Sequence, residues 1–268
     1  MTIQPGVGVG IVLVTLGATL ACLHRASHRR DPEAIRKALH VIMGALTLSF
    51  PWLFLDLWPV LLLAACALAI LSALRCNRRL RASLGRVLFG VSRTSCGEIY
   101  FVLGTAAVFV LAAGNALLFC IPMLLLTFAD AAAALVGTCY GRHRYADGGA
   151  QKSLEGSGAF FTVGLLCAWF PLMLFTTLSG PQVVMVALCV ALAATILEAV
   201  SSRGLDNLLV PLGAFVVLEA SWETGAPPPA LGLIALAGAA VIATWSQAGR
   251  TLTAANGSCR TSGDRNQS

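Results

Sequence analysis

Asp130 is the residue of this sequence whose position most clearly indicates chemistry, because it interrupts an apolar run over residues 115–140. A carboxylate at membrane depth costs roughly 3 kcal/mol on insertion scales, so such residues are usually functional. At 1.5 Å of rise per residue, Asp130 lies about 15 Å from the end of the run at Tyr140. Small residues recur every four positions around it, which lets a ligand or another helix approach closely: Ala129, Ala133, Gly137 and Gly141. Two interpretations remain open: a carboxylate in a wet cleft that binds a divalent cation or a substrate hydroxyl, or a carboxyl group hydrogen-bonded between helices.

The segment that follows, residues 141–157, has the composition of an anion-binding loop. Its glycines allow backbone N–H groups to turn toward an anion. Lys152 adds a compact positive charge, and the start of the next helix adds a favourable dipole. Together these features suit a polyphosphate. The GxxxxGK[ST] spacing of the P-loop is absent, and a plain connector between two helices is the alternative.

A second group of cations stands at the start of the second apolar segment. Residues 31–33 (Asp-Pro-Glu) have the pattern of a helix N-terminus, with proline in the first helical position. Arg36, His40 and Gly44 then fall on one helical face, with Lys37 beside them. Binding of a phosphate or a lipid head group would use all three cations. Interfacial snorkelling explains Arg36 and Lys37 equally well, but it explains His40 poorly.

Acid and amide side chains recur around the linker 201–205. Glu198 precedes this linker, and Asp206 and Asn207 follow it. Carboxylate and amide oxygens are hard ligands of the kind that Mg²⁺ prefers. Asp206 can instead cap the helix that follows it, and the two roles are compatible. Glu98 either joins this site or pairs with an arginine.

The elements that position these residues are predicted to be membrane helices. The chain is 57% hydrophobic and only 11% charged, whereas an average soluble domain carries roughly 25% charged residues. This composition excludes a soluble single-domain enzyme and a disordered chain. Apolar runs such as residues 60–65 show no alternation of polar and apolar residues, which argues against a β-barrel. We therefore expect an all-α, polytopic transmembrane helix bundle.

Nine segments are long and apolar enough to be candidate spans. They cover residues 6–23, 38–55, 57–74, 98–113, 115–140, 158–178, 182–199, 206–220 and 229–246. All 18 lysines and arginines fall in alternate connecting segments or in the C-terminal tail, which lies on the same side. By the positive-inside rule, the N-terminus lies outside and the C-terminus is cytoplasmic. The polar residues described above then gather on the cytoplasmic side of a multi-pass integral membrane protein.

The remainder of the chain adds few chemical groups. We expect residues 1–246 to form one transmembrane domain and the polar residues 247–268 to form a disordered cytoplasmic tail. The first 23 residues lack the basic start of a cleavable signal peptide and are expected to remain as the first helix. The nine cysteines form no CxxC pair, and we expect them to be apolar packing residues.

These elements, in this order, resemble the polyprenol kinase family, which includes dolichol kinase and phytol kinase. Phosphatidate cytidylyltransferases look like more distant relatives. The stretches that carry the resemblance are residues 36–41, residues 130–137 with Gly141, residues 152–157, Glu198, residues 206–208 and Pro211. The resemblance implies phosphoryl transfer to a long-chain isoprenoid alcohol such as phytol, geranylgeraniol or dolichol, usually from CTP and with a divalent metal.

The resemblance and the polar pattern together predict a site in three parts. We expect catalysis to depend on Asp130, Lys152 and Glu155, with one of the two acids orienting the proton of the hydroxyl group. The residues expected to bind the nucleotide phosphates are Arg36, Lys37, His40, Gly137, Gly141, Ser153 and Gly156. The residues expected to hold Mg²⁺ or another divalent cation are Asp130, Glu198, Asp206 and Asn207.

The expected partners are therefore a lipid alcohol, CTP or another nucleotide, and membrane lipids, but no nucleic acid. Two other classes of protein remain as alternatives. A phosphatidate cytidylyltransferase would make CDP-diacylglycerol and release pyrophosphate. A transporter is less favoured, because its polar groups should line a path to both faces of the membrane.

Overall fold

The computed structural model describes residues 4–27, 32–76, 96–145 and 152–222, and these residues are almost entirely helical. An isolated antiparallel bridge joins Arg144 to Ser153. The elements are α1 (Pro5–Ala26), α2 (Pro32–Thr47), α3 (Phe50–Leu53), α4 (Leu57–Cys76), α7 (Gly97–Leu111), α8 (Ala116–Leu124), the π-helical turn η1 (Leu125–Ala129), α9 (Asp130–Tyr140), α10 (Leu154–Phe175), α11 (Gly180–Val200) and α12 (Asp206–Trp222).

Several of these helices have the length and hydropathy of membrane spans. In the described part of the chain, five rods qualify: α1, α4, the continuous rod α8–η1–α9, α10 and α11. The shorter helix α7 is also apolar. An all-helical bundle with several membrane-length helices is therefore confirmed. The total of nine spans and the orientation of the termini stay predictions, and the expected helix 229–246 and the tail 247–268 lie outside the described residues.

Two helices, α2 and α10, differ from the predicted apolar spans by four residues or more at one end or both, for local reasons. We expected an apolar span over 38–55; α2 begins at Pro32, as the Asp-Pro-Glu pattern of residues 31–33 predicted, but it ends early, at Thr47. Pro51 explains this end, because a proline has no N–H to donate to the carbonyl four residues back and its ring clashes with that carbonyl. Similarly, α10 begins at Leu154 and not at 158, because the Ser153 hydroxyl caps the helix by accepting from the Gly156 N–H at 3.1 Å.

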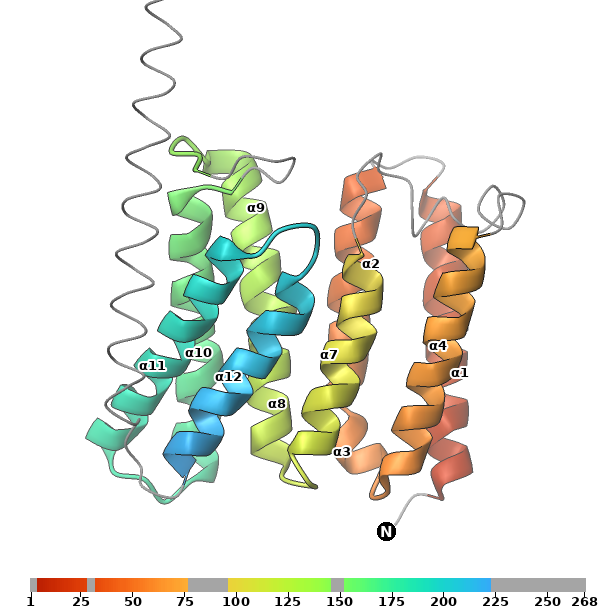
Figure 1. The fold of residues 1–268 in the computed structure, drawn as a ribbon, viewed down its shortest axis with the longest axis horizontal. Helices are drawn as coiled ribbons and strands as arrows, with labels where there is room; N and C mark the ends of the chain where they lie inside the picture. Colours follow the sequence, from red (N-terminus) through yellow and green to blue (C-terminus); the bar gives the residue numbers. More distant parts are fainter. Residues whose placement is uncertain (1–3, 28–31, 77–95, 146–151, 223–268) are drawn as a thin grey trace, which may run out of the picture.

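The helices run roughly side by side, and their polar ends meet at one end of the bundle (Figure 1). The starts of α2, α7, α10 and α12 lie there, together with the ends of α1, α4, α9 and α11. Among the described residues, the basic side chains belong to this end: Arg25, Arg36, Lys37, Arg75, Arg142, Arg144, Lys152 and Arg203. The segregation of charge predicted from the sequence is thus present in the fold.

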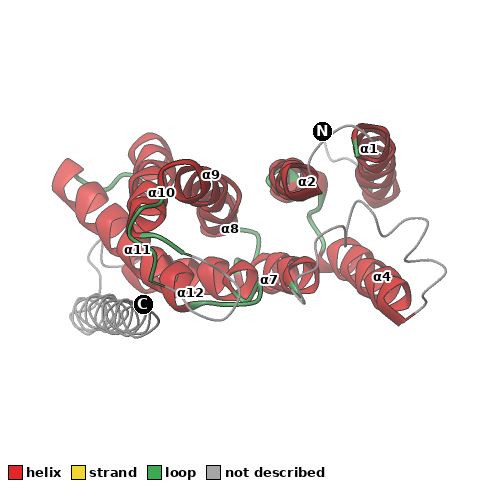
Figure 2. Cartoon of the chain, turned by 90° about the horizontal axis from the view of Figure 1, so that it is seen from above, coloured by secondary structure: helices red, strands yellow, loops and turns green. Residues whose placement is uncertain are grey.

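The packing order of the helices determines which side chains can meet. Helix α10 packs between α9 and α11, α12 packs against α11 and α7, and α2 packs against α1 and the π-helical turn (Figure 2). The largest fully buried side chains come mostly from α7 through α12, including Phe119, Phe160 and Phe215. This apolar core holds the ends of α9, α10, α11 and α12 together, and their polar residues lie there.

Candidate functional site

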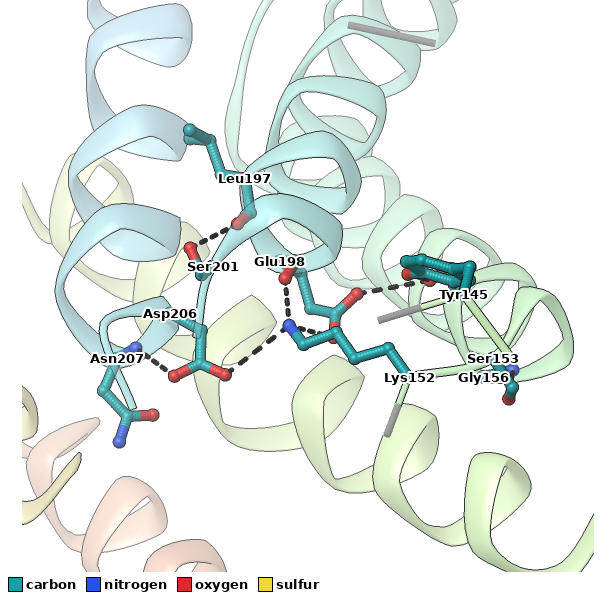
Figure 3. Close-up of polar contacts among 10 residues, drawn as sticks. Tyr145, Lys152, Ser153, Gly156, Leu197, Glu198, Ser201, Asp206 and Asn207 are labelled. Carbon is teal, nitrogen blue, oxygen red and sulfur yellow. Dashed lines mark hydrogen bonds and ion pairs between the residues drawn. The ribbon is translucent and has the colours of Figure 1, made fainter. Parts of the chain in front are cut away.

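Lys152 lies at the centre of an ion-pair cluster formed by three separate helix ends (Figure 3). Its Nζ lies 2.7 Å from Glu198 Oε1 and 3.8 Å from Asp206 Oδ2, and it also donates to the backbone carbonyl of Glu198. The side chains of Lys152 and Glu198 are only 12% and 8% exposed. Charged groups buried to this extent are normally paired, and here each charge of the cluster has a partner of opposite sign within it.

The local backbone explains why these three side chains converge. The carbonyl of Lys152 accepts from the Tyr145 N–H at 3.1 Å, which fixes the loop just before α10. After α11 ends, Arg203 and Gly204 adopt positive φ angles of 56° and 87°. This left-handed turn reverses the chain, and α12 begins at Asp206 beside the end of α11.

A hydrogen-bonded chain of two hydroxyl groups extends the cluster toward the loop. The Tyr145 hydroxyl lies 2.6 Å from the Ser157 hydroxyl, which in turn donates to Glu198 Oε2 at 3.3 Å. Burial, together with the charge of Glu198, raises the pKa of Tyr145 to about 12. Tyr145 is therefore a neutral phenol at physiological pH. Neither residue was predicted to belong to the site, although Ser157 lies within the stretch 152–157 that carries the resemblance.

Asp130 forms a second pair next to this cluster. Its Oδ2 lies 3.5 Å from Nε2 of His40 on α2, and the Asp130 side chain is 29% exposed. Asp130 also interacts electrostatically with Asp206, Lys152 and Arg36, and Glu198 interacts with Asp130 and Asp206. Asp130, Lys152 and Asp206 therefore share one charged end of the bundle, as the sequence predicted.

The cations of α2 divide into two groups in the structure. Arg36 and His40 interact electrostatically with the Asp130 carboxylate, as described above. Lys37 instead donates to the Thr138 hydroxyl at 3.3 Å and lies 3.5 Å from the Ala134 carbonyl. It thus ties α2 to the C-terminal half of α9, where a cation also complements the helix dipole.

Four residues that we expected to bind phosphate form the tight crossing of α9 and α10. They are Gly137, Gly141, Ser153 and Gly156. A Cβ added to Gly156 would lie 3.0 Å from the Ala133 carbonyl oxygen, and one added to Gly141 would lie 2.7 Å from Ser153 Oγ. These short distances show that glycine lets the two helices approach. The structure therefore assigns them a packing role, and their contact with phosphate stays a prediction. The loop residues 146–151, with two of the glycines, lie outside the described residues.

Glu155 has a set of partners that differs from that of Lys152. Its carboxylate accepts from the backbone N–H groups of Arg142 and His143 at 3.2 Å and lies 2.7 Å from His143 Nδ1. These bonds hold the loop that follows α9 against the start of α10. The expected catalytic role of Glu155 stays a prediction, whereas its loop-holding contacts are present in the structure.

Two further polar residues have contacts between helices. Asn207, which is 8% exposed, donates its side-chain amide to the Gly97 carbonyl at 2.9 Å and thereby joins α12 to α7. Glu98 lies 3.3 Å from Arg75 of α4. Of the two options left open for Glu98, the structure shows pairing with an arginine.

The three acids expected to hold a divalent cation lie at the same end of the bundle. Asp130, Glu198 and Asp206 place carboxylates at the same end of the bundle. Mg²⁺ is commonly held by one or two carboxylates plus substrate phosphates. Within the described ranges, no group of three or more His, Cys, Asp and Glu side chains is arranged to hold a metal ion. The expected metal site therefore stays a prediction, and a cation held by these acids would need further ligands from phosphate groups.

The membrane-length helices and the charged cluster at one end of them define a multi-pass membrane protein with a polar site between its helix ends. The chain is 31% identical over 224 residues to phytol kinase of Synechocystis sp., an alignment that covers 81% of this chain and 92% of that protein. It therefore belongs to the phytol kinase family, in agreement with the resemblance seen in the sequence. No family model matches the chain, and no solved structure does.

Proposed function

We propose that this protein is a membrane-embedded kinase that transfers the γ-phosphate of CTP, or of another nucleoside triphosphate, to the hydroxyl group of a long-chain isoprenoid alcohol. The relative named phytol kinase supports the class of reaction. The observation that carries the proposal is the cluster of Lys152, Glu198 and Asp206, with Asp130 beside it. Phosphoryl transfer needs this combination of a cation for phosphate, acids for a metal and an acceptor for a proton.

In this mechanism Asp130 receives the proton of the alcohol. The hydroxyl oxygen bonds to the γ-phosphorus, the bond from that phosphorus to the β,γ-bridging oxygen breaks, and the nucleoside diphosphate leaves. Asp130 suits this role because it stands within an otherwise apolar rod, so an alcohol that lies among the helices can present its hydroxyl there. A positioned acid or base of this kind contributes about 10²- to 10⁴-fold to the rate.

Lys152 and the remaining acids handle the charge of the nucleotide. We assign to Lys152 the contact with the transferred phosphate, and in the structure its Nζ is held between two carboxylates that keep it in place. Arg36, which acts on Asp130 from α2, supplies a second cation nearby. Glu198 and Asp206 would hold a divalent cation, which when bound would neutralise phosphate charge, and this leaves Asp130 free to accept the proton. We place this site on the cytoplasmic side, where CTP is available.

The position of the label in the nucleotide tests the proposal. Purified protein is incubated with Mg²⁺, a panel of phytol, geranylgeraniol, farnesol, dolichol, diacylglycerol and phosphatidate, and CTP or ATP labelled at either the α- or the γ-phosphate. The proposal predicts γ-label in a lipid monophosphate formed from an isoprenoid alcohol. Transfer of α-label to phosphatidate would instead identify a cytidylyltransferase. Absence of either transfer would contradict an enzymatic function of this kind.

A matched pair of variants checks that the activity belongs to the cluster. Lys152→Ala removes the central cation, whereas Glu219→Gln removes a charge from the exposed far end of α12. The proposal predicts that Lys152→Ala loses label transfer and that Glu219→Gln retains it.

A further inference from the structure

The rod that carries Asp130 contains a single π-helical turn, η1, immediately before this residue. The Asp130 N–H donates to the Leu125 carbonyl, five residues back. In an α-helix it would donate to the carbonyl four residues back, which here is that of Leu126. The Leu126 carbonyl instead lies 3.1 Å from His40 Nε2. Single π-turns of this kind are frequent at functional sites.

This contact determines where His40 carries its proton. A carbonyl oxygen only accepts hydrogen bonds, so His40 Nε2 must be the donor. The same nitrogen lies 3.5 Å from Asp130 Oδ2. The nitrogen that donates to the Leu126 carbonyl therefore also lies within ion-pair distance of one oxygen of the Asp130 carboxylate.

The surroundings of His40 hold its ring in this position. Phe101 of α7 packs against the ring edge-to-face, with 5.4 Å between ring centroids. One turn along α2, a Cβ added to Gly44 would collide with the side chain of Thr127 in the π-helical turn. Because α2 touches the π-turn this closely, His40 lies against Leu126 and Asp130 with little freedom to move. The ring is 16% exposed.

We propose that His40 is a positioning residue for Asp130. The π-turn contributes by freeing the Leu126 carbonyl to accept the hydrogen bond from His40 Nε2. The His40 ring, fixed by its N–H on the Leu126 carbonyl, keeps Nε2 3.5 Å from one oxygen of Asp130, so that the other oxygen faces the alcohol hydroxyl and receives its proton. This inference rests on the proposed function. It differs from the phosphate-binding role expected from the sequence, because a positioning residue changes kcat while a phosphate ligand changes the KM for the nucleotide.

Two substitutions separate the N–H donor from the ring. His40→Gln keeps a side-chain N–H donor and loses the aromatic contact with Phe101, whereas His40→Phe keeps a ring beside Phe101 and loses the donor. We expect His40→Gln to retain kcat within about 10-fold, and His40→Phe to lose about 100-fold or more, a loss within the range for a misaligned proton acceptor. The KM for the nucleotide should change by less than about 3-fold in both.

The opposite order would overturn the inference. A His40→Phe variant that is as active as His40→Gln would show that the ring matters and the donor does not. A rise in KM for the nucleotide at unchanged kcat would show that His40 binds phosphate. If the wild type transfers no phosphate to any alcohol, the proposed function fails, a result that is distinct from either of these.

A spectroscopic measurement tests the arrangement without enzymatic activity. Nitrogen NMR of the wild-type protein labelled with ¹⁵N-histidine reports which ring nitrogen carries a proton, and His40→Gln identifies the signal. The inference predicts a protonated Nε2 for His40 in the free protein. An unprotonated Nε2 would overturn it, even if the substituted proteins prove too unstable to assay.

Discussion

Lys152 and Glu198 are 46 positions apart in the chain, yet the lysine Nζ lies 2.7 Å from one carboxylate oxygen of the glutamate and also donates to the glutamate's own backbone carbonyl. Neither side chain has much contact with solvent. Removing two charges from water is expensive, and close geometry with additional hydrogen bonds offsets this cost. The pair therefore joins the start of α10 to the end of α11, and it also provides the cation of the site.

The first prediction concerns removal of this cation. Lys152→Met should abolish phosphate transfer and destabilise the protein by about 3 kcal/mol, because it leaves Glu198 buried without its partner. The double variant Lys152→Met/Glu198→Gln should recover part of the stability but none of the activity. Thermal unfolding in detergent and the label-transfer assay measure the two effects. A single variant as stable as the wild type would show that the pair contributes little to the fold.

The second prediction concerns the crossing of α9 and α10. Gly156→Ala should lower the unfolding temperature in the absence of any ligand, because the added methyl group meets the Ala133 carbonyl at 3.0 Å. Gly158→Ala is the control in the same helix, since nothing lies within 4 Å of a Cβ there. It should be neutral or stabilising by about 0.5–1 kcal/mol. If Gly156→Ala instead unfolds like the control and raises the KM for the nucleotide, Gly156 belongs to a phosphate cradle.

The third prediction separates two roles for Asn207. Its side-chain amide donates to the Gly97 carbonyl at 2.9 Å, so Asn207→Asp should place two acceptors against each other in a buried position. An unpaired buried acceptor costs about 1–3 kcal/mol, which thermal unfolding would detect. A metal ligand would behave differently, because a carboxylate replaces an amide oxygen well at such a site. Full stability and activity in Asn207→Asp would therefore favour the metal-ligand role expected from the sequence.

The fourth prediction follows from the raised pKa of Tyr145. A tyrosine ordinarily titrates near pH 10, whereas in the folded protein the pKa of Tyr145 is about 12. The neutral form is favoured by folding, so its contribution to stability is complete below about pH 10 and is lost as the pH rises through about 12. Phenolate absorbance is followed as a function of pH for the wild type and for Tyr145→Phe. The difference between the two titration curves isolates Tyr145, and its midpoint should lie near pH 12. Tyr140→Phe, which alters an exposed tyrosine, should retain this late step. A midpoint near 10 would contradict the buried position of Tyr145.

Hydropathy alone predicted the class of fold, because a 25-residue rod such as Ala116–Tyr140 is apolar along its length except at Asp130. Local chemistry decided the boundaries that the prediction missed. Ser153 starts α10 four residues earlier than expected, and α2 ends before Pro51. Both signals are visible in the sequence, but they compete with the apolar pattern, which continues through them.

The candidate site was predictable where a charge interrupts an apolar segment or stands at its end. Asp130, Lys152, Glu198 and Asp206 share this property, and the structure brings them together. The partners of each charge were not predictable, because they depend on which helices pack together. The π-turn before Asp130 has no sequence signature, and the glycines at the α9–α10 crossing have the same composition as a phosphate loop.

The central claim is that Asp130 accepts the proton of a lipid alcohol during phosphate transfer, and single-turnover transfer of label tests it most directly. Asp130→Asn and Asp56→Asn are compared with the wild type in one assay with γ-labelled nucleotide and phytol. Asp56 is an exposed acid just before α4, at the opposite end of the bundle. The account predicts that Asp56→Asn transfers label at the wild-type rate and that Asp130→Asn is slower by at least about 100-fold. Transfer by Asp130→Asn at the wild-type rate would contradict it.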